Sequence, residues 1–476
     1  MYSDTLLFID GNWVHGGAGG IPVLDPATGS PIGSVARASK SDLESAVAAT
    51  VAGFETWRRV SAFERSKVLR RAAGILRERA ESVAHIMTQE QGKVISESRA
   101  ETMAACDILE WFAEEGRRAY GRVIPARAPG IEQIVLREPV GPSVAFTPWN
   151  FPINQAVRKI AAALAAGCSI TVKGPEETPA SCAELVRVLA DAGLPAGSLN
   201  LIFGNPSEIS EYLIPHPSVR KISFTGSTAV GKHLAAMAGA HMKRITMELG
   251  GHAPAIVFED ADVDTAVREL AAMKFRNAGQ VCVAPSRFII HERIHDGFVE
   301  DFVAMAKAIK VGNGLDPSST MGPLANQRRV ESMEGLVSDA VARGATLVTG
   351  GKRVGNSGFF FEPTVLIDVP REARLMNEEP FGPIAALSRF QTDESAISEA
   401  NRLPYGLAAY AYTRSAFRAA LLPGSIESGM LSINHYGLAL PEVPFGGIKD
   451  SGLGAEGGME GLEAFLETRF VSRKAA

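Results

Sequence analysis

Strand-like apolar runs alternate with helical stretches from about residue 144 onward, and this alternation limits the fold of the chain more than any other feature. Helical periods near 154–166, 180–192 and 207–213 separate short runs, among them Ser169-Ile170-Thr171-Val172 and Lys221-Ile222-Ser223-Phe224. Strands separated by helices pair in parallel, and a parallel sheet needs helices on both of its faces. We therefore expect an α/β fold.

A second series of the same kind follows Gly250-Gly251, and it includes Ala255-Ile256-Val257-Phe258, Arg287-Phe288-Ile289-Ile290 and Met430-Leu431-Ser432-Ile433. The chain has 476 residues, of which 46% are hydrophobic, so it exceeds the size at which a single core stops growing. We expect two parallel-sheet units joined near residue 250. Helical periods at 43–58, 62–92 and 98–120 precede them.

Two segments have no obvious core of their own. Residues 120–141 alternate apolar and polar side chains around Ala128-Pro129-Gly130, which predicts an extended hairpin, and a strand-like run lies at 466–471. Because exposed strands need a partner, we expect the protein to form homodimers or homotetramers. The alternative is an edge hairpin packed within its own subunit.

The charge and cysteine content exclude several functional classes. Lysine and arginine number 48 against 53 acidic residues, with no long basic block, so nucleic acid is not an expected partner. The four cysteines, at 106, 168, 182 and 282, match no zinc or disulfide pattern, and we expect no metal. The start of the chain has no basic and apolar leader pattern, which predicts a cytoplasmic protein that acts on small molecules without a membrane.

Cys282 and Glu248 are the residues most indicative of chemistry. Cys282 ends Asn277-Ala278-Gly279-Gln280-Val281-Cys282, and Glu248 precedes Leu249-Gly250-Gly251. A thiol nucleophile and a carboxylate base beside small residues are the pair needed to capture an aldehyde carbon and then hydrolyse the acyl-enzyme. Taken alone, Cys282 could be a buried small hydrophobe and Glu248 a surface carboxylate. The pair nevertheless favours an enzyme.

Two glycine motifs bear on nucleotide binding. Gly452 to Gly457 matches GxGxxG, but too few residues follow for a βαβ unit, so we regard this match as spurious. Gly226 to Lys232 resembles a P-loop, yet His233 stands where a magnesium ligand is needed. The segment still lies between an expected strand and an expected helix, and such a turn suits a pyrophosphate, with Ser227 as a hydroxyl donor. The alternative is a tight turn that binds no ligand. Lys173 and Glu176 follow a strand, where a carboxylate can bind ribose hydroxyls.

Seven motifs occur in an order that resembles the NAD(P)-dependent aldehyde dehydrogenases over essentially the whole chain. They are Thr147-Pro148-Trp149-Asn150-Phe151-Pro152, the Lys173 segment, Phe224-Thr225-Gly226-Ser227-Thr228, Glu248-Leu249-Gly250-Gly251, Gly279-Gln280-Val281-Cys282, Glu378-Glu379-Pro380-Phe381-Gly382-Pro383 and Pro444-Phe445-Gly446-Gly447. The resemblance implies a Rossmann-like cofactor domain (1–119 and 142–249) and a second Rossmann-like, catalytic domain (250–440). It also implies a small β hairpin exchanged between subunits, with 120–141 and 441–476 as oligomerisation or bridging segments.

Roles for individual residues follow from the same resemblance. Cys282 would attack the aldehyde, Asn150 and the Cys282 N–H group would stabilise the oxyanion, and Glu248 would activate water. Lys159 and Glu456 would relay protons. NAD would be the preferred cofactor, with NADP as the alternative. Different residues would bind different parts of the cofactor: Lys173 and Glu176 the adenine ribose, Ser227 the pyrophosphate, and Glu379 and Phe381 the nicotinamide ribose. Thr147, Trp149 and Gly204 would shape the site.

The flanks of these motifs are similar to those of succinate-semialdehyde and 2-oxoglutarate-semialdehyde dehydrogenases. The similarity implies that Arg158 and Arg287 hold the distal carboxylate of the substrate, and Gln155 would face the same pocket as Arg158. The alternative is that these arginines form structural ion pairs. The loop 435–441 lacks the serine ligand of many succinate-semialdehyde enzymes, which leaves a broad-range aliphatic or aromatic aldehyde dehydrogenase open. A CoA-acylating enzyme or a non-enzymatic relative is less expected, because Glu248 and Cys282 are both present.

Overall fold

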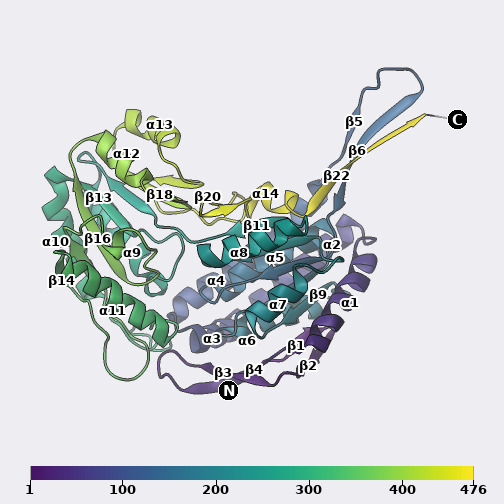
Figure 1. Ribbon diagram of the computed structural model, residues 1–476, viewed down its shortest axis with the longest axis horizontal. Helices are drawn as coiled ribbons and strands as arrows, with labels where there is room; N and C mark the ends of the chain where they lie inside the picture. The colour runs from purple at the N-terminus through teal and green to yellow at the C-terminus, as the bar shows by residue number, and fades with distance from the viewer. Residues whose placement is uncertain (1, 475–476) are drawn as a thin grey trace.

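Two β-sheets with helices on both faces lie side by side, and a β arm projects from one of them (Figure 1). The computed structural model describes residues 2–474. The α/β architecture expected from the alternating pattern is confirmed. None of the helices within these residues has the length and apolar character needed to cross a membrane.

The first sheet has the strand order β2-β1-β9-β8-β7-β10-β11-β21. Its five inner strands run parallel, and they are β7 (Ser143–Phe146), β8 (Ile170–Lys173), β9 (Leu199–Ile202), β10 (Lys221–Thr225) and β11 (Arg244–Glu248). The edges are antiparallel and consist of β1 (Leu7–Ile9), β2 (Asn12–Val14) and β21 (Gly452–Leu453). The strand order reverses between β7 and β10, and such a reversal opens a crevice at the carboxyl ends of the strands.

Eight α-helices belong to this part of the described chain: α1 (Lys40–Trp57), α2 (Ala62–Glu78), α3 (Ala80–Gln91), α4 (Ile95–Glu115), α5 (Pro152–Ala166), α6 (Pro179–Asp191), α7 (Pro206–Leu213) and α8 (Thr228–Ala240). The helical period predicted over 62–92 is divided in two, because Arg79 leaves the helical region and ends α2 where α3 begins. Helices α5, α6 and α7 each start with proline, whose fixed φ suits the first turn.

The second sheet has the strand order β14-β15-β16-β13-β12-β18-β19 and is parallel except at β14. Its strands are β12 (Pro254–Val257), β13 (Arg287–His291), β14 (Thr346–Thr349), β15 (Thr364–Ile367), β16 (Ile384–Phe390), β18 (Ala408–Tyr412) and β19 (Met430–Ile433). Its helices are α9 (Val263–Phe275), α10 (Glu292–Ala308), α11 (Gln327–Ala342), α12 (Asp393–Asn401) and α13 (Ala416–Ser425). The sequence pattern did not predict β18, since alanine, which has low strand propensity, fills three of its positions.

The arm is a three-stranded antiparallel sheet of β5 (Arg122–Ile124), β6 (Ile131–Pro139) and β22 (Leu466–Lys474). Strand β22 pairs with β6 along its whole length, from Leu466 opposite Pro139 to Lys474 opposite Ile131. The remaining elements are η1 (Gly116–Arg118), η2 (Arg276–Gly279), η3 (Arg374–Met376), β3 (Gly20–Leu24), β4 (Pro31–Ala36), β17 (Tyr405–Gly406), β20 (Ile448–Lys449) and α14 (Gly458–Glu463). The GxGxxG match begins in the edge strand β21 and not in a βα turn.

Candidate active site

A cavity of about 560 Å³ opens at the crevice between β7 and β10. One wall comes from the loop after β7, with Trp149 and Asn150, and from the turn after β10, with Ser227. Glu379 and Phe381 of the second unit form the opposite wall, and Cys282 also lines the cavity. Residues far apart in the sequence therefore meet between the two sheets, as the resemblance implied.

Cys282 lies between η2 and β13 at the end of an unusual turn. Asn277, Ala278 and Gly279 have successive φ values of 49°, 51° and 71°, in the left-handed region that non-glycine residues rarely adopt. A Cβ atom on Gly279 would lie 2.1 Å from the carbonyl oxygen of Gly382, so only glycine fits there. Such backbone strain persists where the surroundings enforce it, and here it sets the position of the thiol.

The environment of Cys282 favours the protonated thiol. Burial, followed by the nearby charges of Glu379 and Glu248, raises the pKa of Cys282 to about 12. Cys282 is nevertheless partly exposed to the cavity, whereas the other three cysteines are buried. It is therefore the thiol that a ligand in the cavity can reach.

Asn150 lines the same cavity, and its side-chain Nδ2 donates a hydrogen bond to the carbonyl oxygen of Gln280 over 3.0 Å. This bond ties the loop after β7 to the segment that carries Cys282. The amide is 3% exposed, so its orientation is fixed by packing as well as by the bond. Asn150 and Cys282 thus line the same cavity, and a hydrogen bond joins the segments that carry them.

Glu248, Lys159 and Glu456 form a buried charged cluster. Lys159 Nζ donates to Glu456 Oε1 over 2.5 Å and to Thr225 Oγ1 over 2.6 Å. Glu248 ends β11 at 2% exposure, and within residues 2–474 neither of its carboxylate oxygens has a hydrogen-bond partner. Burial and then the charge of Glu456 raise the pKa of Glu248 well above its usual value. Glu248 lies behind the walls of the cavity and is not among its lining residues.

The start of α8 fits the phosphates of a dinucleotide. Its first turn contains no acidic residue, and the Ser227 side chain at the N-cap makes no capping hydrogen bond. Thr228 Oγ1 is buried without a hydrogen-bond partner among the described residues. Helix N–H groups and two hydroxyls therefore face the cavity, and this donor set matches a pyrophosphate.

Lys173, Glu176, Gly204 and Thr147 form a neighbouring cluster at the ends of β7, β8 and β9, outside the lining of this cavity. Glu176 Oε2 accepts a hydrogen bond from Lys173 Nζ over 2.5 Å, and its Oε1 accepts one from the Gly204 N–H group over 2.9 Å. The Thr147 N–H group donates to the carbonyl oxygen of Lys173. The cluster therefore lies at the same carboxyl-end edge of the sheet as the start of α8, on the β8 and β9 side of β7.

Glu379 and Phe381 face Trp149 across the cavity. The rings of Trp149 and Phe381 meet edge to face at 5.6 Å, and the Gly251 N–H group donates to Glu379 Oε1 over 3.2 Å. Burial raises the pKa of Glu379 to about 7. Arg329, which the sequence analysis missed, donates to the carbonyl oxygens of Pro380 and Phe381 and holds this segment in place.

A second cavity of about 220 Å³ lies on the other side of Cys282. Gln155 and Arg158, both on α5, line it together with Arg276. Its apolar lining comes from residues of five segments: Ala100 and Ala104 of α4, Phe151, Val281 with Val283, Ala439 and Phe445. Gln155 and Cys282 line both cavities, so the thiol stands where the two meet.

Arg158 is buried in this second cavity with unused hydrogen-bonding capacity. Its Nη2 donates to the carbonyl oxygen of Ala439 over 3.2 Å, and the guanidinium lies 5.3 Å from the centre of the Phe445 ring. Its Nη1 is buried without a partner in the part of the chain that the structure describes. Arg276 lies opposite, 5.2 Å from the centre of the Phe151 ring. Sequence reasoning missed Arg276, although it lies in the same loop as Cys282.

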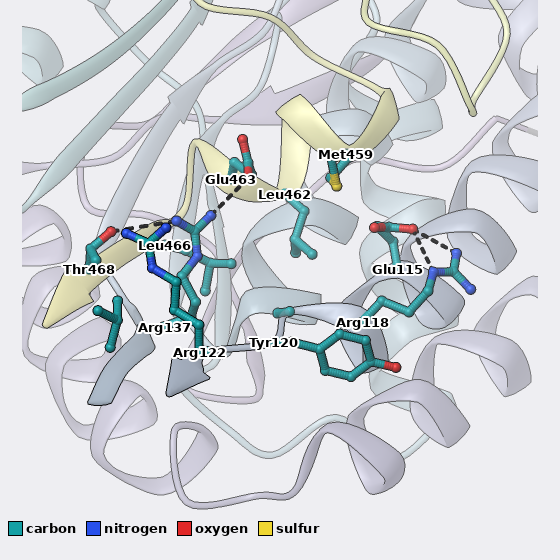
Figure 2. A pocket seen from close by; sticks show the side chains of 13 residues that line it. Glu115, Arg118, Tyr120, Arg122, Arg137, Met459, Leu462, Glu463, Leu466 and Thr468 are labelled. Atoms are coloured by element: carbon teal, nitrogen blue, oxygen red, sulfur yellow. Dashed lines mark hydrogen bonds and ion pairs between the residues drawn. The ribbon is translucent and has the colours of Figure 1, made fainter. Parts of the chain in front are cut away.

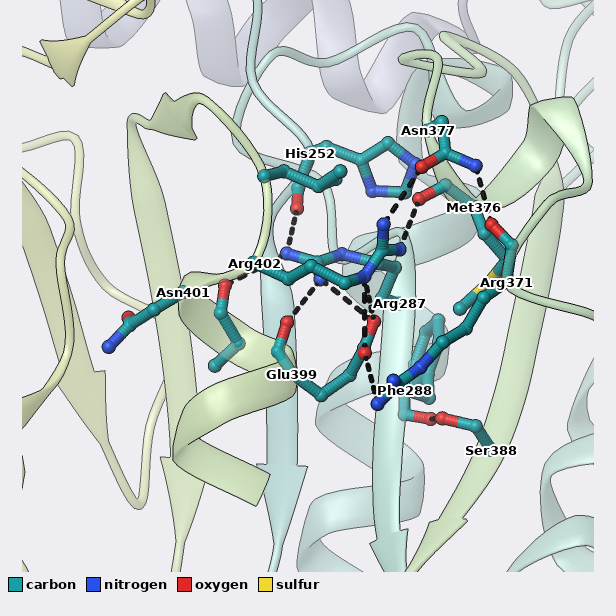
Figure 3. A network of polar contacts seen from close by, with 12 residues as sticks. His252, Arg287, Phe288, Arg371, Met376, Asn377, Ser388, Glu399, Asn401 and Arg402 are labelled. Atoms are coloured by element: carbon teal, nitrogen blue, oxygen red, sulfur yellow. Dashed lines mark hydrogen bonds and ion pairs between the residues drawn. The ribbon is translucent and has the colours of Figure 1, made fainter. Parts of the chain in front are cut away.

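Arg287 does not reach either cavity, and its expected role in substrate binding is wrong. It begins the buried strand β13, and its guanidinium donates to the carbonyl oxygens of Glu399 (2.5 Å) and Ala400 (3.0 Å). Figure 3 shows Arg287 and Arg402 converging on Glu399. The structure supports the alternative, in which Arg287 forms a structural ion pair. A side chain at the start of a central strand packs against its neighbours.

Comparison with known proteins agrees with this architecture. The family model described as the aldehyde dehydrogenase family matches residues 13–471. The chain is 47% identical to a putative 4-(hydroxymethyl)benzenesulfonate dehydrogenase of Comamonas testosteroni, over 99% of this chain and 98% of that protein. It is 44% identical to the mitochondrial succinate-semialdehyde dehydrogenase of Mus musculus, over 98% of this chain and 89% of that protein.

A solved structure of a succinate-semialdehyde dehydrogenase from Burkholderia pseudomallei superposes with a TM-score of 0.97 at 40% identity. The superposition covers 99% of this chain and 98% of that chain. The two sheets and the arm therefore occur in one known fold. This chain belongs to the aldehyde dehydrogenase family and is an NAD(P)-dependent oxidoreductase.

Proposed function

We propose that this enzyme oxidises short aldehydes that carry an anionic group at the far end, and that succinate semialdehyde or 2-oxoglutarate semialdehyde is the substrate. One observation carries the proposal: the cavity that begins at Cys282 contains Arg158, buried with a free Nη1 within the described residues, and Arg276. A buried guanidinium N–H group without an acceptor is costly unless an anion completes the site. Its fork geometry suits a carboxylate.

The acidic residues of this cavity do not cancel that preference. Glu101 is paired with Lys93 at 2.6 Å, and Glu97 accepts hydrogen bonds from the Asn277 N–H group. Both carboxylates are therefore engaged, whereas Arg158 retains an unused donor. The two relatives described above are also named for compounds that carry an anionic group, a sulfonate in one and a carboxylate in the other.

The residues around Cys282 suit a covalent oxidation of the aldehyde. After the Cys282 thiol has given its proton to water, the sulfur adds to the aldehyde carbon, and the resulting oxyanion accepts hydrogen bonds from Asn150 Nδ2 and the Cys282 N–H group. A bound nicotinamide cofactor would supply hydride acceptance at that carbon, and Cys282 would then carry the acyl group as a thioester. Glu248 removes a proton from the water that hydrolyses the thioester, and Glu456 and Lys159 pass the proton onward. A carboxylate in this position favours hydrolysis over transfer to coenzyme A.

For the cofactor, we propose a preference for NAD over NADP. The support is Glu176, whose carboxylate lies at the end of β8, where the adenine ribose binds in dinucleotide sites. A 2′-phosphate would stand against this negative charge and would displace its hydrogen bonds. The pairing of Lys173 with Glu176 reduces the repulsion without removing it.

A second candidate substrate is an aromatic aldehyde with a sulfonate at the far end. The apolar walls between Cys282 and the arginines, formed by Phe151, Val281 and Phe445, favour a ring in that space. The relative named for 4-(hydroxymethyl)benzenesulfonate is consistent with this second candidate.

We further propose that the protein assembles into homo-oligomers through the arm, with 120–141 and 441–476 as the oligomerisation and bridging segments. The arm exposes Tyr120 and Val123 at 76% each and Phe470 at 58%. Figure 2 shows the pocket at its root, which Tyr120, Met459 and Leu462 line. Apolar side chains on an exposed strand favour pairing with another chain. Light scattering should give at least a dimer, and a monomer would contradict the proposal.

A substrate panel tests the proposed activity. Formation of reduced cofactor is measured with succinate semialdehyde, 4-sulfobenzaldehyde, butanal and benzaldehyde, each with and without coenzyme A. We expect the two anionic aldehydes to exceed their uncharged partners in kcat/KM by about tenfold to a hundredfold, which corresponds to one charge-assisted hydrogen bond. Equal values for butanal and succinate semialdehyde would favour a broad-range enzyme, and dependence on coenzyme A would favour an acylating one.

A further inference from the structure

Helix α4 places two carboxylates beside the substrate cavity that have no assigned role. Glu97 and Glu101 lie one helical turn apart and line the cavity together. Each carboxylate accepts hydrogen bonds from main-chain N–H groups of a different segment. One of these segments follows Asn150, and the other leads to Cys282.

Glu101 holds the segment that follows Asn150. Its Oε1 accepts hydrogen bonds from the N–H groups of Ile153 (3.0 Å) and Asn154 (3.1 Å) at the start of α5. Its Oε2 pairs with Lys93 Nζ, and both side chains of the pair are buried, at 0% and 1% exposure. Lys93 Nζ also donates to the Asn150 carbonyl oxygen over 2.8 Å. The pair therefore holds the main chain on both sides of Phe151.

Glu97 holds the segment that leads to Cys282. Both of its carboxylate oxygens accept from the Asn277 N–H group, at 3.2 and 3.1 Å. Asn277 is the first residue of the left-handed turn. Its side-chain Nδ2 donates to the carbonyl oxygens of Asn150 (3.0 Å) and Gln280 (3.3 Å), which links the two segments to each other.

A buried ion pair such as Lys93 with Glu101 is a weak source of stability, because the cost of removing two charges from water offsets most of their attraction. Its hydrogen bonds are nevertheless directional, and they fix three main-chain groups on the two sides of Phe151. Glu97 fixes a fourth, the Asn277 N–H group. A displacement of reacting groups by about 1 Å can cost a hundredfold in rate. The main effect of this arrangement is therefore to fix the positions of these main-chain groups, and its contribution to stability is small.

We propose that Lys93, Glu97 and Glu101 are positioning residues that hold the two halves of the active site in register: Glu101 with Lys93 fixes the oxyanion donor Asn150, and Glu97 fixes the turn that carries Cys282. The inference rests on the roles proposed above for Cys282 and Asn150. It adds that α4, a helix of the cofactor-binding unit, controls the position of a thiol that belongs to the other unit.

Two isosteric variants separate the two halves of the proposal. The rate at which iodoacetamide labels Cys282 is followed by mass spectrometry without substrate or cofactor, and kcat and the KM values are measured in parallel. Glu97→Gln should speed labelling by about threefold or more at every pH between 6 and 9, because the neutral amide oxygen accepts the Asn277 N–H group more weakly than the carboxylate and the loosened turn exposes the thiol. It should lower kcat by about tenfold to a hundredfold.

Glu101→Gln should lower kcat to a similar extent and change the labelling rate of Cys282 much less than Glu97→Gln does, because it acts directly on the oxyanion donor and only through Asn277 and Gln280 on the thiol. The Kd of NAD should be unchanged in both variants, since neither residue lines the cofactor cavity. Unchanged labelling and kcat in Glu97→Gln, or equal labelling changes in the two variants, would overturn the proposal. If Glu97→Gln does not fold, Glu97→Asp withdraws the same carboxylate by one methylene group and serves as the test.

Glu399→Gln is the matched control, because Glu399 is also a buried carboxylate paired with arginine and lies outside both cavities. It should lower Tm without changing labelling at 25 °C. Faster labelling in this variant would mean that general destabilisation explains the effect, which also overturns the proposal. Labelling needs no turnover, so a failure of the catalytic role of Cys282 would appear separately, as undiminished activity of Cys282→Ala.

Discussion

The two cavities that meet at Cys282 are built in different ways. The cofactor-side cavity is formed mainly by the carboxyl ends of β7 and β10 and the start of α8, so main-chain groups set by the topology supply much of it. The substrate-side cavity is formed by side chains from α4, α5, η2 and the loop before Phe445. We therefore propose that the fold determines where a dinucleotide binds, whereas individual side chains determine which aldehyde is accepted.

The largest expected effect concerns the residue the two cavities share. Cys282→Ala should lower steady-state formation of reduced cofactor by about a thousandfold or more, because no covalent adduct can form. The Kd of NAD, measured by fluorescence titration, should stay the same. Turnover near the wild-type rate would remove Cys282 from its role.

Glu248→Gln should separate the two chemical steps. Hydride leaves before water attacks, so the variant should give a burst of one equivalent of reduced cofactor per site, followed by a steady state slower by about a hundredfold to ten-thousandfold. Stopped-flow absorbance measures both phases. A variant that loses the burst and the steady state together would show that Glu248 acts before hydride transfer.

The three arginines test which side chains of the substrate-side cavity select the aldehyde. Arg158→Gln and Arg276→Gln should each lower kcat/KM for succinate semialdehyde by about tenfold to a hundredfold and leave butanal little changed, since one charge-assisted hydrogen bond is lost. Arg287→Gln is the control. It should lower Tm through the loss of the Glu399 contacts while keeping the same preference between the two aldehydes.

The smallest effect is expected on the cofactor side. Glu176→Ser should shift the ratio of kcat/KM for NADP to that for NAD by about tenfold toward NADP, because one opposing charge is removed. The preference among aldehydes should not move. A change in aldehyde preference would show that the two cavities are not independent.

Much of the fold and of the cofactor side could be predicted from the sequence because both depend on local patterns. The runs at 221–224 and 430–433 lie in strands, and the turn after Phe224 does begin a helix. The break at Arg79 and the strand β18 could not be predicted, because the first lies inside a continuous helical period and the second is rich in alanine.

The substrate side was harder to predict because loop conformation decides which side chains face it. Arg276 and Arg287 lie on opposite sides of Cys282 in the sequence, and spacing alone does not distinguish them. Arg276 leaves the helical conformation at the end of α9 and lies at the cavity, whereas β13 carries Arg287 into the core. The apolar run that begins at Arg287 was the available sign that its side chain would be buried.

A crystal structure of Cys282→Ala with NAD and succinate semialdehyde tests the central claim most directly. We predict that the aldehyde carbon lies beside position 282, with its oxygen near Asn150 Nδ2, and that the carboxylate lies within hydrogen-bond distance of Arg158 and Arg276. The nicotinamide ring should enter from the other cavity, between Trp149 and Glu379. A carboxylate bound away from both arginines, or an aldehyde that enters from the cofactor side, would contradict the account.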